Sequence, residues 1–345
     1  MSCYSGQKND EDIPFSQNLV NMVNPLMGTD SEFSLSNGNT YPAIAMPWGM
    51  NFWSPMTGKM GDGWMYKYDD HFIYGFKQTH QPSPWINDYA AFSLMAVTGN
   101  LKFKEDDRRS WFSHKAEEAH PHYYKTYLAD HDVVVEITPS ERAAHFRFTF
   151  PQNDSSFILL DAFDMGSMVN IDSGTRTITG YCRNNHGGVP ENFRNYFIAR
   201  FDKDFEVMQT WSDGWKLFPD SRIREGAHTG AIIGFSTKRG EQVHVKVASS
   251  FISPEQAALN LENEIGNRTF PETRSESFNA WNRELNRVRI NDDNPGHTKT
   301  FYSCLYRLLL FPRKFYEINK AGEIVHYSPY NGQVLPGYLF TDNGF

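Results

Sequence analysis

A period of two in the hydrophobic residues of the central chain constrains the fold more than any other sequence feature. In the segment AAHFRFTF, Phe146 and Phe148 share one face of an extended strand, while His145 and Arg147 share the other. The segment EQVHVKVASSF repeats this pattern, and turn-forming clusters such as PQND and KRG separate the runs. Many short strands joined by turns indicate an antiparallel β-sandwich over about residues 18–253, rather than a parallel sheet with crossover helices.

After residue 253 the hydrophobic period becomes helical. Pro254 is suited to the first turn of a helix, because its missing N–H has no partner to lose there. The segment SESFNAWNRELNRVRI then predicts an apolar helical stripe of Phe278, Trp281, Leu285 and Val288. A third predicted helix, HTKTFYSCLYRLLLFP, is apolar around much of its circumference and therefore requires several packing partners.

Residues 24–88 combine glycine, proline and asparagine with tryptophan and tyrosine, and contain few aliphatic residues. Glycine lets a backbone approach a ligand closely, flat rings offer a stacking surface, and amides supply directional hydrogen bonds. This mixture suits carbohydrate. A loop-rich β domain with aromatic corners would have a similar composition, so the segment alone leaves both interpretations open.

Several long motifs carry a resemblance to a known family. NPLMGTD, GNTYPAIAMPWGM, GFKQTHQPSP, FYSCLYRLLLFPRKFYE and TDNGF are similar to segments of glycoside hydrolase family 92, over about Val23 to Phe345. Members of that family are calcium-dependent, exo-acting, inverting α-mannosidases. The resemblance implies a mainly β fold, in which an antiparallel β-sandwich is followed by the first helices of a truncated (α/α)6 barrel.

The resemblance and the change of period together divide the chain into four parts. The polar N-terminal tail has no periodicity and is expected to be a disordered tether. The expected parts are the tether at residues 1–17, the β-sandwich domain at 18–253, a helical linker at 254–295, and the start of the (α/α)6 catalytic domain, truncated, at 296–345.

The resemblance also implies where the chemistry lies. The general acid and general base of the family belong to the part of the barrel beyond residue 345, so we expect no catalytic acid or base in this chain. Asp342, in TDNGF, is expected to accept hydrogen bonds from hydroxyls of the mannose that is cleaved. An N-cap for a following helix is the alternative role of Asp342.

Trp85 follows two prolines that stiffen its loop, and the resemblance places it near the leaving sugar. An aromatic plug in the sandwich is the alternative role of Trp85. The remaining expected substrate-binding residues are Gly38, Asn39, Trp48, His80 and Gln81.

These expectations describe the N-terminal part of an α-mannosidase, with an α-1,2 preference, that trims N-glycan or mannan oligosaccharides. The partner is then an α-mannoside oligosaccharide or an N-glycan, and the cofactor is Ca²⁺ with its ligands in the missing part of the barrel. We expect the fragment to be inactive alone. The rival interpretation is a non-catalytic carbohydrate-binding β-sandwich module, for which the helical tail and TDNGF would have no use.

The net charge and the cysteines of the chain limit which partners and which cellular location are expected. The chain has 33 Lys and Arg against 41 Asp and Glu, and this net charge of −8 does not favour nucleic acid or anionic membrane as a partner. Cys182 and Cys304 are expected to be small buried apolar residues. Cys3 begins the tail as a bacterial lipoprotein begins after removal of its signal peptide. We therefore hypothesise a lipid on Cys3 as the membrane contact, and a location in the bacterial periplasm or at the cell surface.

Overall fold

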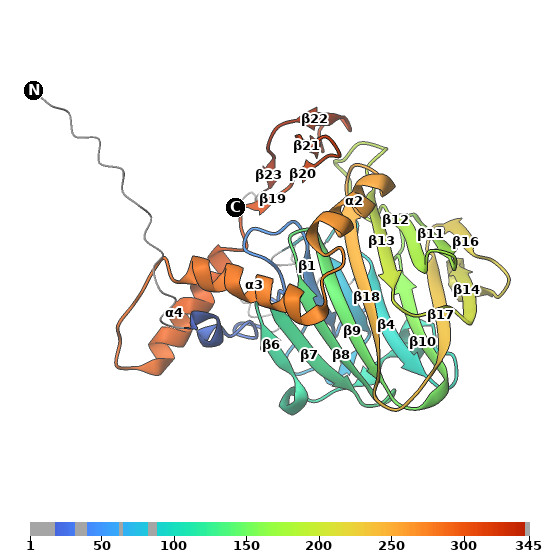
Figure 1. The fold of residues 1–345 in the computed structure, drawn as a ribbon, viewed down its shortest axis with the longest axis horizontal. Helices are drawn as coiled ribbons and strands as arrows, with labels where there is room; N and C mark the ends of the chain where they lie inside the picture. The colour runs from blue at the N-terminus through green and yellow to red at the C-terminus, as the bar shows by residue number, and fades with distance from the viewer. Residues whose placement is uncertain (1–17, 32–39, 62–64, 82–87, 342–345) are drawn as a thin grey trace, which may run out of the picture.

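The computed structural model of the chain describes residues 18–31, 40–61, 65–81 and 88–341. Two large antiparallel sheets face one another in a sandwich, helices lie on one side of it, and small sheets of the C-terminal segment lie at one end (Figure 1). The mainly β, antiparallel architecture expected from the sequence is confirmed.

One of the two sheets has seven strands, and strands distant in sequence are neighbours in it. In the middle of this sheet, Leu159 pairs with Met95 on one side and with Ile232 on the other. The strands, in order across the sheet, are β1 (Phe52–Met56), β3 (Gly75–Thr79), β4 (Ser93–Thr98), β10 (Asn153–Asp161), β17 (Gly230–Thr237), β14 (Val207–Ser212) and β15 (Lys216–Phe218).

The facing sheet has nine strands. Its register places Phe146 opposite Val245 and Phe148 opposite Val243, so two of the predicted period-two runs pair with each other. The strands, in order, are β16 (Ile223–Gly226), β11 (Ser167–Asp172), β12 (Thr177–Cys182), β13 (Asn195–Phe201), β18 (Glu241–Ser250), β9 (Ala143–Phe150), β8 (Val133–Pro139), β7 (Tyr123–Leu128) and β6 (Glu118–His120).

The main hydrophobic core lies between these two sheets. Phe146 and Phe148 are fully buried there, as their alternation predicts, together with Trp53 and Trp211. The Trp211 ring closes on Gly230, where an added Cβ would lie 1.9 Å from a ring carbon. Only glycine allows the two strands to pack at that point.

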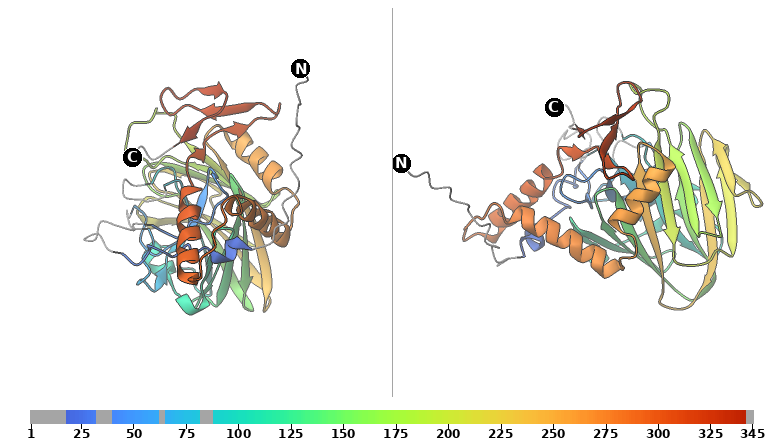
Figure 2. Two further views of the ribbon diagram at one scale, coloured as in Figure 1. Left: turned by 90° about the vertical axis from the view of Figure 1, so that its left-hand side faces the viewer. Right: turned by 45° about the horizontal axis from the view of Figure 1, so that its top comes forward.

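Two helices cover the outer face of the nine-stranded sheet (Figure 2): α2 (Pro254–Glu264) and α3 (Phe270–Leu285). Ser253 caps α2 by accepting a hydrogen bond of 3.1 Å from the backbone N–H of Gln256. Phe270 of α3 packs on the ring of His145 at a centroid distance of 5.3 Å. His145 points away from the core as predicted, but the sequence did not reveal that α3 would bury it.

A second hydrophobic cluster joins the helices to the N-terminal segment. In this cluster α4 (Pro295–Leu308) packs with the 3-10 helix η1 (Leu19–Met22), and Tyr302 and Tyr306 are buried. The indole N–H of Trp281 donates a 2.6 Å hydrogen bond to the carbonyl of Ala45, which ties α3 to the loop before β1.

Two sequence expectations for the helices are wrong. Helix α3 ends at Leu285, so Val288 does not extend its buried stripe and is 43% exposed. Cys182 is buried as expected, but Cys304 lies on the exposed side of α4. Helix α4 turns its tyrosines inward and leaves Leu308 72% exposed, which agrees with a helix that is apolar around much of its circumference and lacks some of its packing partners.

One arginine connects three distant segments of the chain. Arg142 lies in the turn between β8 and β9 and is 4% exposed. Its Nη1 forms an ion pair of 2.8 Å with Glu264 at the end of α2, and its Nε and Nη2 donate to the carbonyl of Tyr316 at 3.0 and 2.7 Å. The hairpin, α2 and the C-terminal segment are therefore fixed together by one guanidinium.

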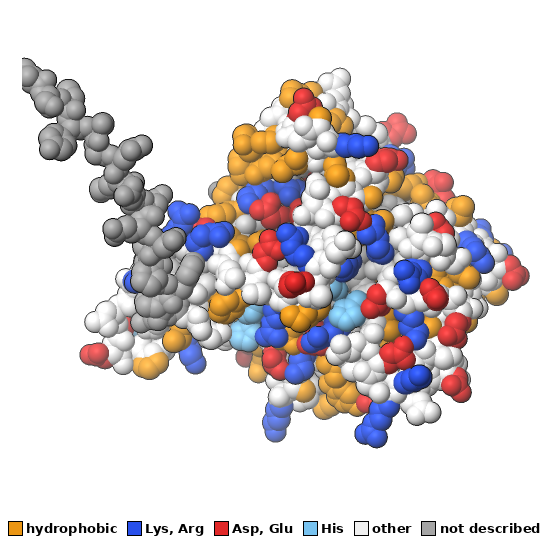
Figure 3. All heavy atoms as spheres, in the orientation of Figure 1, with side chains coloured by type: hydrophobic (Ala, Val, Ile, Leu, Met, Phe, Trp, Pro, Cys, Tyr) orange, Lys and Arg blue, Asp and Glu red, His pale blue; other side chains and the backbone are white. Residues whose placement is uncertain are grey.

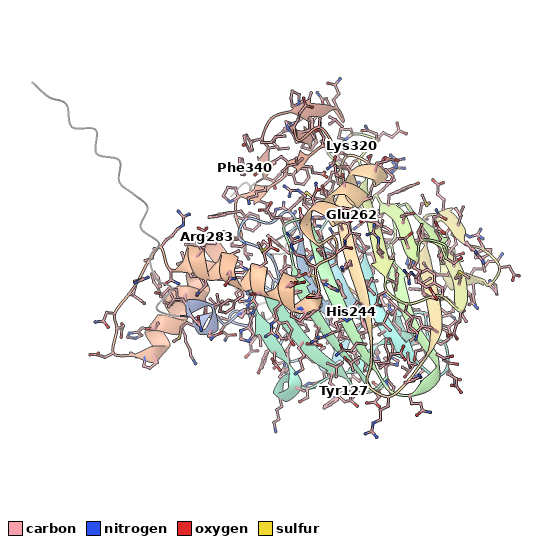
Figure 4. All side chains as sticks on the ribbon, viewed as in Figure 1. Tyr127, His244, Glu262, Arg283, Lys320 and Phe340 are labelled. Atoms are coloured by element: carbon pink, nitrogen blue, oxygen red, sulfur yellow. The ribbon has the colours of Figure 1, made fainter. Side chains whose placement is uncertain are left out.

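The described residues after α4 form only short strands, which the sequence did not predict. They build a two-stranded sheet and a three-stranded sheet near the end of α2, where Figure 4 labels Phe340 and Lys320. The strands are β19 (Arg313–Lys314) paired with β23 (Phe340–Thr341), and β20 (Glu317–Ile318), β21 (Ile324–Tyr327) and β22 (Val334–Pro336) in that order.

These strands carry an exposed group of rings that we call the C-terminal aromatic patch, made of Tyr316, Tyr338 and Phe340. Tyr338 and Phe340 stack at a centroid distance of 6.2 Å and are 62% and 52% exposed. Tyr316 packs edge-on against both rings. Hydrophobic side chains gather on the surface in this region (Figure 3).

The remaining short elements lie at the edges of the sandwich. No helix in the described ranges is long and apolar enough to span a membrane. The short elements at the edges of the sandwich are the pair of strands β2 (Phe72–Ile73) and β5 (Ser110–Trp111), helix α1 (Glu105–Arg108), and the 3-10 helices η4 (His114–Ala116) and η5 (Asp213–Trp215).

Candidate functional site

The candidate site lies where three parts of the chain meet at one end of the sandwich. These parts are the Trp48–Met50 turn before β1, the loop that leaves β3 at His80, and β19 of the C-terminal segment. The backbone of Trp48 joins the first part to the C-terminal segment, since its N–H donates to Leu309 at the end of α4 at 2.8 Å and its carbonyl accepts from Lys314 of β19 at 2.9 Å.

His80 is fully buried and holds its imidazole between these parts. Its Nδ1 donates a 3.2 Å hydrogen bond to the carbonyl of Met50, and its ring stacks on Tyr89 at a centroid distance of 5.1 Å. Burial lowers the pKa of His80 to about 4, although the nearby Asp88 acts in the opposite direction. At neutral pH the ring is therefore uncharged, and its Nε2 is an acceptor with no partner among the described residues.

Arg313 approaches the same ring of Tyr89 from β19. The guanidinium is 2% exposed, and its Nη2 donates a 2.7 Å hydrogen bond to the Tyr89 hydroxyl. Its Nε and Nη1 have no hydrogen-bond partner in the part of the chain that the structure describes, and no described carboxylate forms an ion pair with it. The guanidinium lies 5.6–6.0 Å from the ring centroids of Phe52, Tyr89 and Phe311, so within the described ranges this buried cation is held by aromatic rings and one hydroxyl rather than by a carboxylate.

Asp88 and the residues after it fix the returning arm of the loop. One carboxylate oxygen of Asp88 accepts hydrogen bonds from the backbone of His80 at 3.1 Å and of Tyr89 at 2.9 Å. Ala90 has a φ of 50°, which is unusual for a residue with a side chain, and its backbone is held on both sides by Asn184 and Asn195. The stacked rings of His80 and Tyr89 are therefore rigidly placed.

Of the seven expected binding residues, the structure describes Trp48, His80 and Gln81, and it places all three at this end of the sandwich. Gln81 is 9% exposed, its carbonyl accepts from the Tyr41 hydroxyl, and its side-chain oxygen has no partner among the described residues. The other four expected residues, which are Gly38, Asn39, Trp85 and Asp342, lie outside the described residues.

Two residues of the cluster were missed by the sequence analysis. Tyr89 lies among other aromatic residues in the sequence and has no distinguishing signal. Arg313 is a charged residue just after an apolar helix and a proline, and that context could have drawn attention to it. Arg313 pairs across the β19–β23 ladder with Thr341, the residue before Asp342, which links the cluster to the TDNGF motif.

The described residues do not fit a calcium site. No three His, Cys, Asp or Glu side chains gather in the described ranges in a way that could hold a metal ion. The most buried carboxylates there are already engaged, since Asp161 binds Arg108 and His228, and Glu317 accepts from Asn260 and from the backbone of Phe251. Hard cations require several free oxygen ligands, so no chemical step is assigned to calcium on these residues.

Comparisons with known proteins identify the family of the chain. The family model of the glycosyl hydrolase family 92 N-terminal domain matches residues 22–250, and that of the family 92 catalytic domain matches residues 256–345. The inverting mannosidase BT2199 of family GH92, from Bacteroides thetaiotaomicron, is 44% identical, with a TM-score of 0.91 over 94% of this chain and 44% of its own. The GH92 α-mannosidase BT3965 from the same organism, solved with mannoimidazole, is 29% identical with a TM-score of 0.83, over 94% of this chain and 44% of its own.

A curated relative is more distant. A protein described as an uncharacterized secreted glycosidase, from Arthroderma benhamiae, is 21% identical over 87% of this chain and 42% of its own length. The chain thus spans less than half the length of these relatives.

Proposed function

Because the chain belongs to glycosyl hydrolase family 92, we propose that it forms the N-terminal, substrate-holding part of an inverting exo-α-mannosidase with an α-1,2 preference. The observation that carries this proposal is the cluster of buried hydrogen-bonding groups around Tyr89 that have no partner among the described residues. An uncharged His80 acceptor and the free Arg313 donors lie beside stacked rings, and sugar hydroxyls both donate and accept hydrogen bonds. The substrate class is an α-mannoside oligosaccharide or N-glycan.

The residues of this chain hold the substrate and do not move its protons. Inverting hydrolysis requires a carboxylic acid on the leaving oxygen and a carboxylate that activates water on the opposite face of the ring. We assign neither to this chain and propose that both lie in the part of the relatives' length that it does not span. A buried ring with its pKa near 4 is a poor proton donor or acceptor at neutral pH, so we assign His80 a binding role.

The expected residues beyond the described ranges complete this proposal. Asp342 would accept hydrogen bonds from hydroxyls of the cleaved mannose, and Trp85 would contact the leaving sugar. Gly38 and Asn39 would form a backbone shelf beside the pocket. In the same proposal residues 1–17 are a tether, 18–253 the sandwich domain, 254–295 a helical linker and 296–345 the start of the barrel, and calcium binds outside this chain.

The test uses a longer protein, of the length of the family 92 relatives, whose N-terminal part is this chain. We call it the long protein. It is assayed for mannose release from α-1,2-mannobiose and from an aryl α-mannoside, whose activated leaving group needs little binding. Trp85→Ala should lower kcat/KM about ten- to a hundredfold on mannobiose and much less on the aryl substrate, as loss of a stacking contact worth about 1–3 kcal/mol implies. Trp111→Ala, at an exposed indole, is the matched control.

Two outcomes contradict the assignment. Absence of mannose release from either substrate by the long protein would refute the α-mannosidase activity. Equal losses on both substrates, with a lower melting temperature, would make Trp85 a packing residue, because truncating a buried tryptophan costs about 3–5 kcal/mol.

The rival function is a carbohydrate-binding module that catalyses no reaction. Assays of the 345-residue chain and of the long protein, side by side, distinguish the two functions. On our proposal the 345-residue chain releases no mannose while the long protein does. If the long protein binds α-mannosides but does not hydrolyse them, the module is the better description.

Export with a lipid on Cys3 is the proposed route to the periplasm or cell surface. The relative described as a secreted glycosidase supports an extracellular location. Mass spectrometry of the natively expressed protein should show a diacylglyceryl mass on Cys3, and a free thiol there would refute the anchor.

A further inference from the structure

A partly open cavity of about 260 Å³ lies on the other side of β3 from His80. Side chains alternate along a strand, so Lys77 points away from the sheet face on which Gln78 and His80 lie. The cavity is lined by Lys77 and Asp88 together with the turn at Phe163 and the loop at Asn184. It is therefore separate from the cluster around Tyr89 and Arg313.

An ion pair with unused hydrogen-bonding capacity forms one wall of this cavity. The ammonium of Lys77 lies 3.1 Å from Oδ2 of Asp88, and the two side chains are 5% and 4% exposed. Apart from this ion pair, Oδ2 has no hydrogen-bond partner within the described ranges. Burial would raise the pKa of Asp88, but Lys77 and His80 outweigh it and lower the pKa, so the carboxylate is charged.

The opposite wall is held in an unusual backbone conformation. Phe163 and Met165 have φ values of 59° and 64°, which few residues with side chains adopt. The backbone N–H of Phe163 donates a 3.1 Å hydrogen bond to Asp161, which is itself paired with Arg108 at 2.7 Å. The Phe163 ring lies beneath the Lys77 ammonium, 5.6 Å away. A wall fixed in this way is prepared to receive a ligand without further ordering.

The charges around the cavity select the class of ligand. Lys77 contributes one positive charge, Asp88 and the exposed Asp164 contribute two negative ones, and His186 also lines the cavity, so the lining has no net positive charge whatever the protonation of His186 and does not favour an anion such as phosphate. A neutral molecule with adjacent hydroxyls can accept from the ammonium and donate to the free Oδ2. The volume lies below the range of about 300–1,000 Å³ that is usual for drug-sized ligands, so the ligand is small.

We propose that this cavity binds a single uncharged sugar ring through two neighbouring hydroxyls, one accepting from Lys77 and the other donating to Asp88. Asn184 and the Phe163 ring complete the pocket. Sugar binding in this cavity does not require that the protein hydrolyses mannosides. Asp88 is the one residue that the cavity shares with the cluster around Tyr89, and it contributes Oδ1 to that cluster and Oδ2 to the cavity.

The test is binding of methyl α-D-mannopyranoside to the 345-residue chain, measured by calorimetry and by amide NMR. We expect saturable binding with a Kd on the order of 1 mM, accompanied by shifts of the Asn184 and Asn185 side-chain amide signals. Asp88→Asn retains an oxygen for the backbone of His80 and Tyr89 but removes the charged acceptor, and should weaken binding at least about tenfold. Asp106→Asn, in the exposed 2.6 Å ion pair with Lys59, is the matched control and should bind as the unaltered chain does.

Each remaining outcome overturns the proposal. Absence of binding up to tens of millimolar, binding that shifts only signals away from Asn184 and Asn185, or displacement of the mannoside by inorganic phosphate contradicts a neutral sugar at this place. If Asp88→Asn fails to fold, the NMR signals of the unaltered chain decide the matter. Mannose release by the long protein is a separate measurement, so failure of the mannosidase proposal leaves this one standing.

Discussion

Replacing His122 should make the protein resist acid, and the size of the effect follows from its surroundings. The imidazole lies in the turn between β6 and β7, is 4% exposed, and packs edge-on against Phe278 of α3 at 5.1 Å. Its Nδ1 has no partner among the described residues. Burial, followed by the neighbouring His120 and Arg274, lowers the pKa of His122 to about 3.

The sign and magnitude follow from proton linkage. An unfolded chain binds a proton at His122 below a pH of about 6.5, whereas the folded chain does not until about pH 3, so folding loses stability as the pH falls between these values. Each pH unit in this range costs about 1.4 kcal/mol. From pH 7.5 to pH 5.5 His122 alone should remove about 1.4 kcal/mol, and this loss should be absent in His122→Leu.

Urea unfolding at the two pH values measures the effect. The unaltered chain and His122→Leu are compared by their change in unfolding free energy between pH 7.5 and 5.5, so any fixed effect of the substitution cancels. His297→Leu, at an exposed imidazole, is the control and should lose stability as the unaltered chain does. If His122→Leu also loses as much, His122 is protonated in the folded state and the argument from burial is wrong.

Three further predictions concern the core and the surface. Asp161→Asn should cost about 3–5 kcal/mol in urea unfolding, because it leaves the fully buried Arg108 without its anion, whereas Asp204→Asn in an exposed pair should cost less than about 1 kcal/mol. Gly230→Ala should prevent native folding, seen as loss of the near-UV circular dichroism signal, because its Cβ would overlap Trp211. The chain should bind a hydrophobic dye, and serine at the three positions of the C-terminal aromatic patch should abolish much of that binding without lowering the melting temperature.

The parts of the fold that were predictable are those with a local cause. Alternation in AAHFRFTF fixes which residues face the core, and the structure buries Phe146 and Phe148 accordingly. The burial of His145 on the opposite face could not be predicted, because it depends on Phe270, which lies more than a hundred residues later in the chain. Strand order in the two sheets likewise depends on pairings between distant segments.

The candidate site shows the same division. The glycine- and aromatic-rich motifs indicated the loops, and His80 and Gln81 lie in the cluster they suggested. Arg313 joins that cluster through a hydrogen bond to Tyr89, which is 224 residues away in the sequence. No local pattern encodes that contact, and the Arg313 donors that have no partner within the described ranges appear only once the chain is folded.

The connections of Arg142 impose an order on synthesis. Its partners Glu264 and Tyr316 lie 122 and 174 residues further along the chain. At about 5–20 residues per second, the ribosome adds Tyr316 roughly 9–35 s after Arg142. Until then the guanidinium lacks the Tyr316 carbonyl and, for most of the interval, Glu264, so of its contacts only the ion pair with the neighbouring Glu141 can form early. The turn between β8 and β9 therefore cannot dock fully before Tyr316 has been added. The sandwich can therefore form its inner core during translation, but its helical side closes last, and until then that side is the surface that a chaperone would encounter.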